Sequence, residues 1–395
     1  MALSEIKEPS RARRISILGA TGSIGNSTAD LIRRNRDRFD VVAVTAHRNA
    51  EALAALAREF DAELAVVSDP DAYPALRDAL VGTGTEAAGG HDALTVAAGV
   101  DADLIVAGIV GAAGLDSTLA AVGQGSLVAL ANKESLVCAG DLVLAAIEKS
   151  GARLLPLDSE HNAIFQVFEN ENAGDVEKLI LTASGGPFRT WSRARMAAAT
   201  PDEAVAHPNW DMGRKISVDS ATMMNKGLEL IEAAYLFPVA PEEIEVLVHP
   251  QSVVHSMVAY VDGSVLAQLG PPDMRVPIAH ALAWPARMES AVTRLDLAAI
   301  GSLEFSAPDD ERFPAIPLAR AALMAGRGAT VILNAANEIA VESFLDARIG
   351  FLDIAETVAR VLDRVEGFEI ASLEDFRSLD RESREIAKNL VKSAS

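Results

Sequence analysis

Cysteine is almost absent from this chain, which has one residue of this type, Cys138, among 395. A single cysteine excludes a framework of internal disulfides and is typical of a reducing compartment. Basic residues are also scarce: 35 Lys and Arg stand against 56 Asp and Glu, giving a formal net charge of −21. This charge argues against a nucleic-acid partner, because phosphate backbones favour Lys and Arg. It leaves room for a small anionic ligand in a local basic pocket.

Long apolar stretches are missing as well. The first fourteen residues contain no apolar core of a secretory signal, and the longest apolar run, 104–115, is shorter than the ~20 residues that cross a bilayer. We therefore expect a cytoplasmic protein with no membrane partner. Half of the residues are hydrophobic, as in globular proteins, and the length predicts two or three domains.

The first part of the chain alternates between strand-like and helix-like segments. Strands are expected at 15–18, 41–45, 64–67, 104–107 and 127–130, and helices at 26–34, 50–60 and 139–149. This alternation predicts an α/β fold with a Rossmann-like, doubly wound parallel sheet that is covered by helices on both faces. We assign it to residues 1–158.

The pattern changes after Asp158. Strands at 179–182, 245–248, 252–261 and 265–269 and a helix at 225–237 predict an α/β middle domain with a mixed sheet over 159–284. Residues 285–314 are expected to form a linker. An apolar stripe of Ile354, Val358, Val361, Leu362 and Val365 predicts a C-terminal helical bundle domain over 315–395.

A glycine-rich turn, Gly19-Ala-Thr-Gly22-Ser-Ile-Gly25, follows the first strand. Glycines permit a tight turn and close backbone approach, and the N-terminus of the following helix can hold a pyrophosphate. The spacing differs from the usual G-x-G-x-x-G, and a purely structural turn is the alternative. We expect a dinucleotide here.

The second strand favours NADP over NAD. An NAD site usually has an acid at the end of this strand, whereas here the strand is followed by His47 and Arg48, and Asp40 lies at its other end. Arg48, helped by His47, suits a 2′-phosphate through charge-assisted hydrogen bonds. The alternative is an ordinary solvated arginine.

Charged side chains follow two further strands. The run LLPLDSE, 154–160, ends with Asp158 and Glu160 on either side of Ser159. In an extended segment these two carboxylates share a face, so they repel unless a cation lies between them. Lys133 and Glu134 follow the strand 127–130, at the sheet edge where ligands collect. Solvated surface charges are the alternative in both places.

The middle domain offers a helix face and two loops. Asn225, Lys226 and Glu229 are three and four residues apart and can share one side of a helix, with an exposed face as the alternative. The loop 206–215, with its aromatic residue and two cations, is typical of a lid over an anionic ligand, or of a passive loop anchored by a buried tryptophan. The loop 184–187 can offer a hydroxyl and amides to a phosphate.

The chain closely resembles the 1-deoxy-D-xylulose 5-phosphate reductoisomerase family. The resemblance lies in the stretches GATGSIG, IVGAAGL, LANKESLV, LPLDSEHNAIFQ, SGGPFR, HPNWDMGRKISVDSATMMNKGLELIEA, HPQSVVHSMV, LGPPDMR and LNAANEIA, in order from residue 19 to 340. It implies reduction and isomerisation of a phosphorylated ketose, 1-deoxy-D-xylulose 5-phosphate, to 2-C-methyl-D-erythritol 4-phosphate in non-mevalonate isoprenoid synthesis. It also implies NADPH, a divalent cation (Mg²⁺ or Mn²⁺, with Co²⁺ as a further candidate) and a homodimer. Retro-aldol/aldol chemistry and a 1,2-shift are both compatible with these residues.

The resemblance also implies roles for individual residues. The metal ligands are Asp158, Glu160 and Glu229, an all-oxygen set that suits a hard cation. With Lys133 and His207 these ligands make up the catalytic residues. The substrate contacts are Lys133, Ser159, Glu160, Ser184, His207, Ser220, Asn225, Lys226 and Glu229. The cofactor contacts are Thr21, Gly22, Ser23, Ile24, His47, Arg48, Asn49, Asn132, Glu134 and Gly213. Trp210 and Met212 correspond to the family's mobile lid.

The sequence departs from the family's pattern at residue 47, where relatives often have glycine and this chain has His47. Two other functions compete with the resemblance. A phosphorylating semialdehyde dehydrogenase would need Cys138 as its nucleophile, but this residue stands in an apolar stretch with no adjacent histidine. A redox-sensing regulator would bind the dinucleotide without a metal requirement, which the acidic cluster argues against.

Overall fold

The structure is a computed structural model that describes residues 11–210 and 212–394. Most of the N-terminal stretch in which no secretory signal was found, residues 1–10, lies outside the described residues, as does Asp211 in the expected lid. The described residues form two units, and each unit is assembled from separate stretches of the chain. Of the described residues, the first unit comprises 11–135, Val143–Asn162 and Asp273–Thr293, and the second comprises Leu136–Leu142, 163–210, 212–272 and 294–394.

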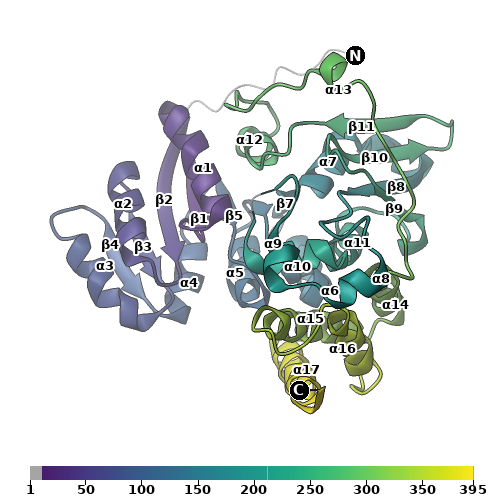
Figure 1. The fold of residues 1–395 in the computed structure, drawn as a ribbon. Coiled ribbons are helices and arrows are strands. Elements are labelled where there is room, and N and C mark those ends of the chain that lie inside the picture. The colour runs from purple at the N-terminus through teal and green to yellow at the C-terminus, as the bar shows by residue number, and fades with distance from the viewer. Residues whose placement is uncertain (1–10, 211, 395) are drawn as a thin grey trace. The chain divides into compact units, whose positions relative to one another are not determined.

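A seven-stranded parallel sheet forms the centre of the first unit, with the strand order β4-β3-β2-β1-β5-β6-β7 (Figure 1). Its strands are β1 (Arg13–Leu18), β2 (Phe39–Ala46), β3 (Leu64–Val67), β4 (Glu86–Gly89), β5 (Leu104–Ala107), β6 (Leu127–Leu130) and β7 (Arg153–Pro156). The order reverses between β1 and β5, so the predicted doubly wound sheet is confirmed. The strand β5 is apolar and buried along its whole length, as expected where both faces of a parallel sheet are covered.

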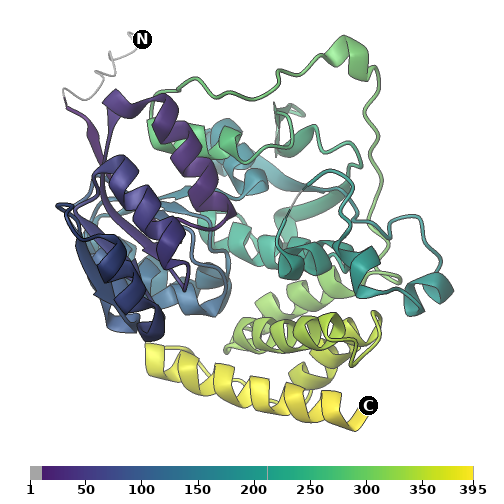
Figure 2. The same ribbon diagram turned by 60° about the vertical axis from the view of Figure 1, so that its left-hand side comes forward.

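Helices cover both faces of this sheet (Figures 1 and 2). They are α1 (Ser23–Arg34), α2 (Ala50–Phe60), α3 (Tyr73–Ala79), α4 (His91–Ala98), α5 (Leu115–Gly123) and α12 (Arg275–Ala283). The helix α6 (Glu134–Ser150) follows β6, and its residues Leu136–Leu142 belong to the second unit. The helix predicted at 139–149 begins earlier than expected, at Glu134, because α6 continues through a kink at Ala139 (φ −146°, ψ 35°). The helix α12 comes from a late stretch of the chain and packs against α1 and beside β6 and β7.

The second unit contains a mixed four-stranded sheet, as predicted. Its order is β11-β10-β8-β9, and only the pair β8–β9 is parallel. The strands are β8 (Val176–Ala183), β9 (Ile244–Val248), β10 (Val254–Tyr260) and β11 (Val265–Leu269). The chain between β8 and β9 forms α8 (Arg193–Ala197), α9 (Pro201–Val205), α10 (Arg214–Ala221) and α11 (Met224–Leu236).

The C-terminal part of the second unit is helical, as predicted. It contains α14 (Ala315–Ala325), α15 (Ala329–Leu345), α16 (Asp353–Leu362) and α17 (Leu373–Ala394), and the last three pack on one another (Figure 2). Ile354, Val358 and Val361 of the predicted stripe are fully buried in α16. The stretch 285–314 contains a short helix, α13 (Leu297–Ile300), and Ser306 forms a single bridge to Val248 of β9. Among the described residues, no helix has the length and apolar character that crossing a membrane requires.

Candidate active site

The glycine-rich turn lies between β1 and α1, at the carboxyl edge of the first sheet. Gly19 has a positive φ of 81°, and its N–H donates to Thr45 Oγ1 at the end of β2 (2.9 Å). A Cβ on Gly25 would lie 2.4 Å from the backbone of Ala20, so only glycine fits there. The turn brings the first N–H groups of α1 to the sheet edge, where they can bind an anion.

The end of β2 carries the residues expected to select the cofactor. Arg48 is exposed and forms an ion pair with Asp69, a nearly buried residue that follows β3. His47 Nδ1 lies 2.9 Å from Ser68 Oγ, and Asn49 caps α2. The sequence analysis missed Asp69, because only the pairing of β2 with β3 brings the two loops together.

The residues after β6 are buried rather than solvated. The Asn132 side chain donates to the carbonyl oxygens of Ile109 and Gly111, and its Oδ1 accepts from Ser135 N (2.7 Å). This network joins the loops that follow β5 and β6. Lys133 and Glu134 are each 6% exposed, so the interpretation as a surface charge pair is wrong.

The turn after β7 differs from the extended segment that the sequence suggested. The strand ends at Pro156 and α7 (Ser159–Val167) begins three residues later, so Asp158 and Glu160 flank a helix start. Asp158 Oδ1 accepts from Glu160 N at 3.2 Å, as is common at such a turn. The acidic pair is therefore brought together by a turn and not by strand alternation.

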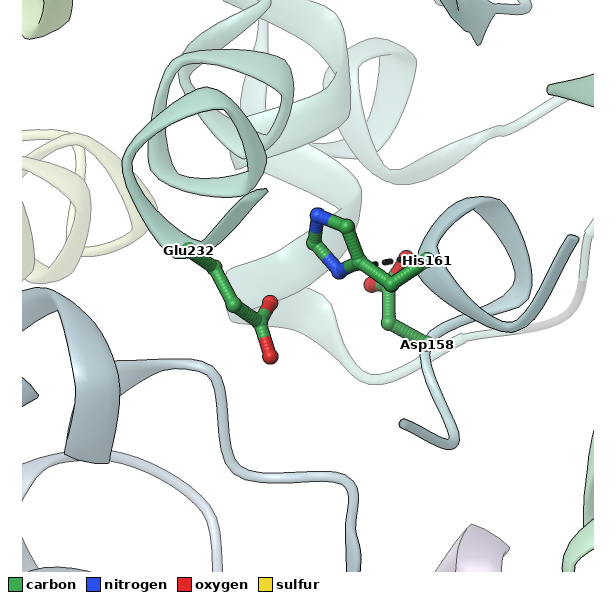
Figure 3. A group of neighbouring side chains, drawn as sticks. All are labelled: Asp158, His161 and Glu232. Carbon is green, nitrogen blue, oxygen red and sulfur yellow. Dashed lines mark ion pairs between the residues drawn. The ribbon is translucent and has the colours of Figure 1, made fainter. Parts of the chain in front are cut away.

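Cationic and polar partners surround Asp158 within the first unit. Lys133 Nζ lies 2.7 Å from Asp158 Oδ2. His161 Nδ1 lies 3.5 Å from Asp158 Oδ1, as Figure 3 shows. The side chains of Lys133 and Asp158 are only 8% and 11% exposed. A buried ion pair of this kind is weak evidence for stability, because desolvation offsets much of the attraction, and it is a common feature of functional sites.

The helix α11 of the second unit carries the predicted cluster on one side. Glu229 accepts hydrogen bonds from both Asn225 and Lys226. Lys226 and Glu229 are 3% and 1% exposed, so the alternative of an exposed helix face is wrong. Glu232, also labelled in Figure 3, is a second buried acid of α11.

In the second unit, the loop that carries Ser184 lies beside His207 and beside the helix end that carries Ser220. Ser184 Oγ and His207 Nε2 are 2.9 Å apart. Gly186 (φ 66°) packs so tightly on the end of α10 that an added Cβ would lie 2.6 Å from Ser220 O. The loop 184–187 is thereby held against the helix that carries Ser220.

The protonation of His207 follows from its surroundings. Its Nδ1 accepts from the backbone N–H groups of Asn209 (3.1 Å) and Trp210 (3.0 Å), so the proton of the neutral ring lies on Nε2. Burial lowers the pKa of His207 and keeps the ring neutral. Nε2 then donates to Ser184 Oγ.

The expected lid segment is anchored to the strand-connecting turn between β9 and β10. Asn209 Nδ2 donates to Pro250 O (2.8 Å) and to Ser252 Oγ (3.0 Å). The rings of Trp210 and His255 lie 6.2 Å apart. Gly213 caps the N-terminus of α10 and is exposed.

Two residues of the quoted stretch LPLDSEHNAIFQ received no role from the sequence. His161 is fully buried beside Asp158, and Asn162 is 1% exposed. The sequence could have indicated them by position, because both lie in the first turn of α7, directly after Asp158 and Glu160. Cys138, by contrast, is a buried residue of α6, 4% exposed, as the interpretation of an inert thiol requires.

Comparison with known proteins decides the family. The model described as 1-deoxy-D-xylulose 5-phosphate reductoisomerase matches residues 15–140, and the two models of the C-terminal domains of that enzyme match residues 154–237 and 269–386. The chain belongs to the 1-deoxy-D-xylulose 5-phosphate reductoisomerase family. The family predicted from the motifs is thus confirmed.

Curated reductoisomerases are similar over nearly the whole chain. The protein of Zymomonas mobilis subsp. mobilis is 56% identical over 97% of this chain and 99% of its own length. That of Rhodospirillum centenum is 58% identical over 96% and 94%, respectively.

Solved reductoisomerase structures share the fold. A Zymomonas mobilis structure in complex with NADPH has a TM-score of 0.93 at 55% identity, covering 97% of this chain and all of that one. A reductoisomerase in complex with NADPH, fosmidomycin and magnesium has a TM-score of 0.91 at 48% identity, covering 96% of this chain and 98% of that one.

Proposed function

We propose that this chain converts 1-deoxy-D-xylulose 5-phosphate into 2-C-methyl-D-erythritol 4-phosphate, with NADPH as reductant and a divalent cation. Membership of the reductoisomerase family supports the reaction, and solved relatives bind NADPH and magnesium. The observation that carries the residue assignment is the burial of two ion pairs, Lys133–Asp158 and Lys226–Glu229. All four residues lie in stretches that carry the resemblance to the family.

Asp158, Glu160 and Glu229 are proposed to hold the divalent cation. Their donors are carboxylate oxygens, which Mg²⁺ and Mn²⁺ prefer over the nitrogen and sulfur ligands of softer ions. Such an ion, when bound, acts as a Lewis acid on substrate oxygens. The chain's own part is to hold Asp158 beside Lys133 and Glu229 beside Lys226.

Lys133, Ser159 and His207 are proposed to contact the sugar hydroxyls. Lys133 is the residue best suited to move a proton, because its ammonium group is buried and already engaged with a carboxylate.

Ser184, Ser220, Asn225 and Lys226 are proposed to bind the phosphate. Ser184 Oγ accepts from His207 Nε2 and from Gly186 N (3.1 Å), so its own proton is left to donate to an anion. Lys226 adds a buried positive charge on α11, the helix that packs against α10, which carries Ser220. A hydroxyl and an ammonium group together suit a phosphate monoester.

NADPH is proposed to bind along the carboxyl edge of the first sheet. Thr21, Gly22, Ser23 and Ile24 form the turn and the first residues of α1, where the pyrophosphate is stabilised by free N–H groups. His47, Arg48 and Asn49 follow β2, and Arg48 suits the 2′-phosphate. Asn132, Glu134 and Gly213 complete the proposed set.

A homodimer is proposed to form through the edge strand β11. One side of this strand pairs with β10, and Val265, Leu266 and Leu269 are between 37% and 51% exposed. An exposed apolar edge strand can pair with a second copy. The single cysteine supports a cytoplasmic location.

The reaction is tested by following NADPH oxidation with 1-deoxy-D-xylulose 5-phosphate, with and without a chelator, and by identifying the product by NMR. We expect turnover that the chelator abolishes and added Mg²⁺ or Mn²⁺ restores. Oxidation that continues without metal, or a product with an unbranched carbon chain, would contradict the proposal.

A further inference from the structure

Asn162 links the two ends of the turn that carries Asp158 and Glu160. Its side chain is 1% exposed, and Nδ2 donates to Pro156 O at the end of β7 (2.9 Å). Its backbone N–H donates to Asp158 O in the first turn of α7 (2.8 Å). One residue thus fastens both sides of the proposed metal-binding turn.

His280 of α12 makes a further contact with this residue. Its Nδ1 lies 3.2 Å from Asn162 Nδ2, and the two residues are 118 positions apart in the sequence. Nδ2 has two N–H groups, of which one is used by Pro156 O, so the other donates to His280 Nδ1. The opposite orientation of the amide would place its oxygen against Pro156 O, where two acceptors would face each other.

The ring of His280 has the protonation that this bond needs. Burial lowers the pKa of His280 to about 4, with a smaller contribution from the charge of Arg287. The ring is therefore neutral near pH 7, and its proton lies on Nε2 while Nδ1 accepts.

The helix that carries His280 is held firmly within the first unit. Arg275, near its start, forms ion pairs with Asp30 of α1 (3.2 Å) and with Asp273 (2.6 Å). Arg13 of β1 donates to the carbonyl oxygens of Leu282 (2.7 Å) and Trp284 (3.0 Å) at its end. Both ends of α12 are thus tied to the sheet and its covering helix, so His280 has little freedom to move away from Asn162.

We propose that His280 is a positioning residue which, through Asn162, sets the geometry in which Asp158 and Glu160 bind the divalent cation. This inference rests on the proposed function, because it takes Asp158 and Glu160 as metal ligands. Residues that orient metal ligands through hydrogen bonds typically contribute about 10–100-fold to metal affinity. The segment Asp273–Thr293 would then serve the metal site although it lies more than a hundred residues beyond it.

The experiment measures Mn²⁺ binding to the full chain by EPR or calorimetry, without substrate. We expect His280→Leu, which removes the acceptor, to weaken Mn²⁺ binding by about 10-fold or more. His280→Asn places an oxygen close to the position of Nδ1 and should restore binding to within a few-fold of the wild type. Trp284→Phe, a packing change on the same segment, should leave binding unchanged.

A double-mutant comparison separates the effect of the hydrogen bond from any general destabilisation that His280→Leu causes. If His280 acts through Asn162, the effect of His280→Leu on Mn²⁺ affinity should vanish in an Asn162→Ala background, since the bond is already gone. Equal effects in both backgrounds would overturn the proposal, as would wild-type affinity of the His280→Leu variant. Equal weakening by His280→Leu and His280→Asn would assign His280 a packing role and also overturn it.

Asp158→Asn separates this inference from the proposed function. This variant should lose Mn²⁺ binding if Asp158 is a ligand. Retained binding would refute the ligand assignment, whereas loss in Asp158→Asn with no effect of His280→Leu would refute only the role of His280.

Discussion

Arg48 and Asp69 form an ion pair in which the carboxylate side chain is 9% exposed and the guanidinium side chain 72% exposed. Asp69 accepts from Nε, the inner nitrogen of Arg48, which leaves the two terminal nitrogens for a bidentate contact. The backbone N–H of Asp71 and the Arg48 guanidinium lower the pKa of Asp69, so it remains a carboxylate. Asp69 therefore orients Arg48, the residue that is proposed to bind the 2′-phosphate.

Arg48→Glu should discriminate between the two nicotinamide cofactors. We expect KM for NADPH to rise about 10–100-fold, since a hydrogen bond to a charged group contributes roughly 1.5–3 kcal/mol, whereas KM for NADH should change little. The measurement is steady-state kinetics with each cofactor. Asp69→Asn should raise KM for NADPH less than Arg48→Glu, because the guanidinium is retained. Equal losses with NADPH and NADH would show that Arg48 does not bind the 2′-phosphate.

Glu229→Gln should abolish metal-dependent turnover without unfolding the protein. The substitution keeps the size of the side chain and one accepting oxygen, but it removes the charge that Lys226 and the proposed cation share. We expect kcat to fall by about two orders of magnitude or more, with Mn²⁺ affinity reduced in parallel. Circular dichroism checks the fold. Glu245→Gln, at an exposed carboxylate paired with Lys178, is the matched control and should behave as the wild type. Normal turnover of Glu229→Gln at saturating Mg²⁺ would rule out the ligand role.

Gly25→Ala should damage the cofactor turn. The added Cβ would lie 2.4 Å from the backbone of Ala20, so the start of α1 must shift. We expect KM for NADPH to rise about tenfold or more and stability to fall by about 1–3 kcal/mol, as is usual for overpacking. Gly84→Ala is the control, because a Cβ there meets no atom within 4 Å. An unchanged KM in Gly25→Ala would argue against cofactor binding at this turn.

His280 should make the free energy of unfolding depend on pH. Its pKa is about 4 in the folded protein against 6.5 for an unperturbed histidine. Between these values the unfolded chain binds a proton that the folded protein does not, so stability is present above pH 6.5 and is lost as the pH falls. Between about pH 7 and about pH 5 this loss is on the order of 2 kcal/mol.

The contribution of His280 is isolated by comparing wild type and His280→Asn in urea unfolding at both pH values. The variant should lose less stability on acidification, because asparagine does not titrate. An identical loss in both proteins would show that His280 titrates normally in the folded state.

Sequence reasoning located several elements to the residue. The strands β3, β5, β6 and β11 were predicted with the bounds that the structure has, because each is a short apolar or alternating run bounded by turn residues. Sequence reasoning missed the strand β4, Glu86–Gly89. This strand has no apolar run and is defined by its pairing with β3. Sequence reasoning also took residues 158–160 as extended, since a helix that begins with Ser159 directly after a strand leaves little local signal.

The sequence by itself determined the parallel sheet, the glycine turn and the grouping of Asn225, Lys226 and Glu229, because these depend on periodicities of a few residues. Only the tertiary structure decided that Lys133 pairs with Asp158, that Asp69 orients Arg48 and that His280 reaches Asn162. Each of these contacts joins residues 21 to 118 positions apart, and the pairing of strands and the return of α12 bring them together. Local propensity carries no information about contacts between residues so far apart in the sequence. Only the packing of the chain determines which loops meet at a sheet edge.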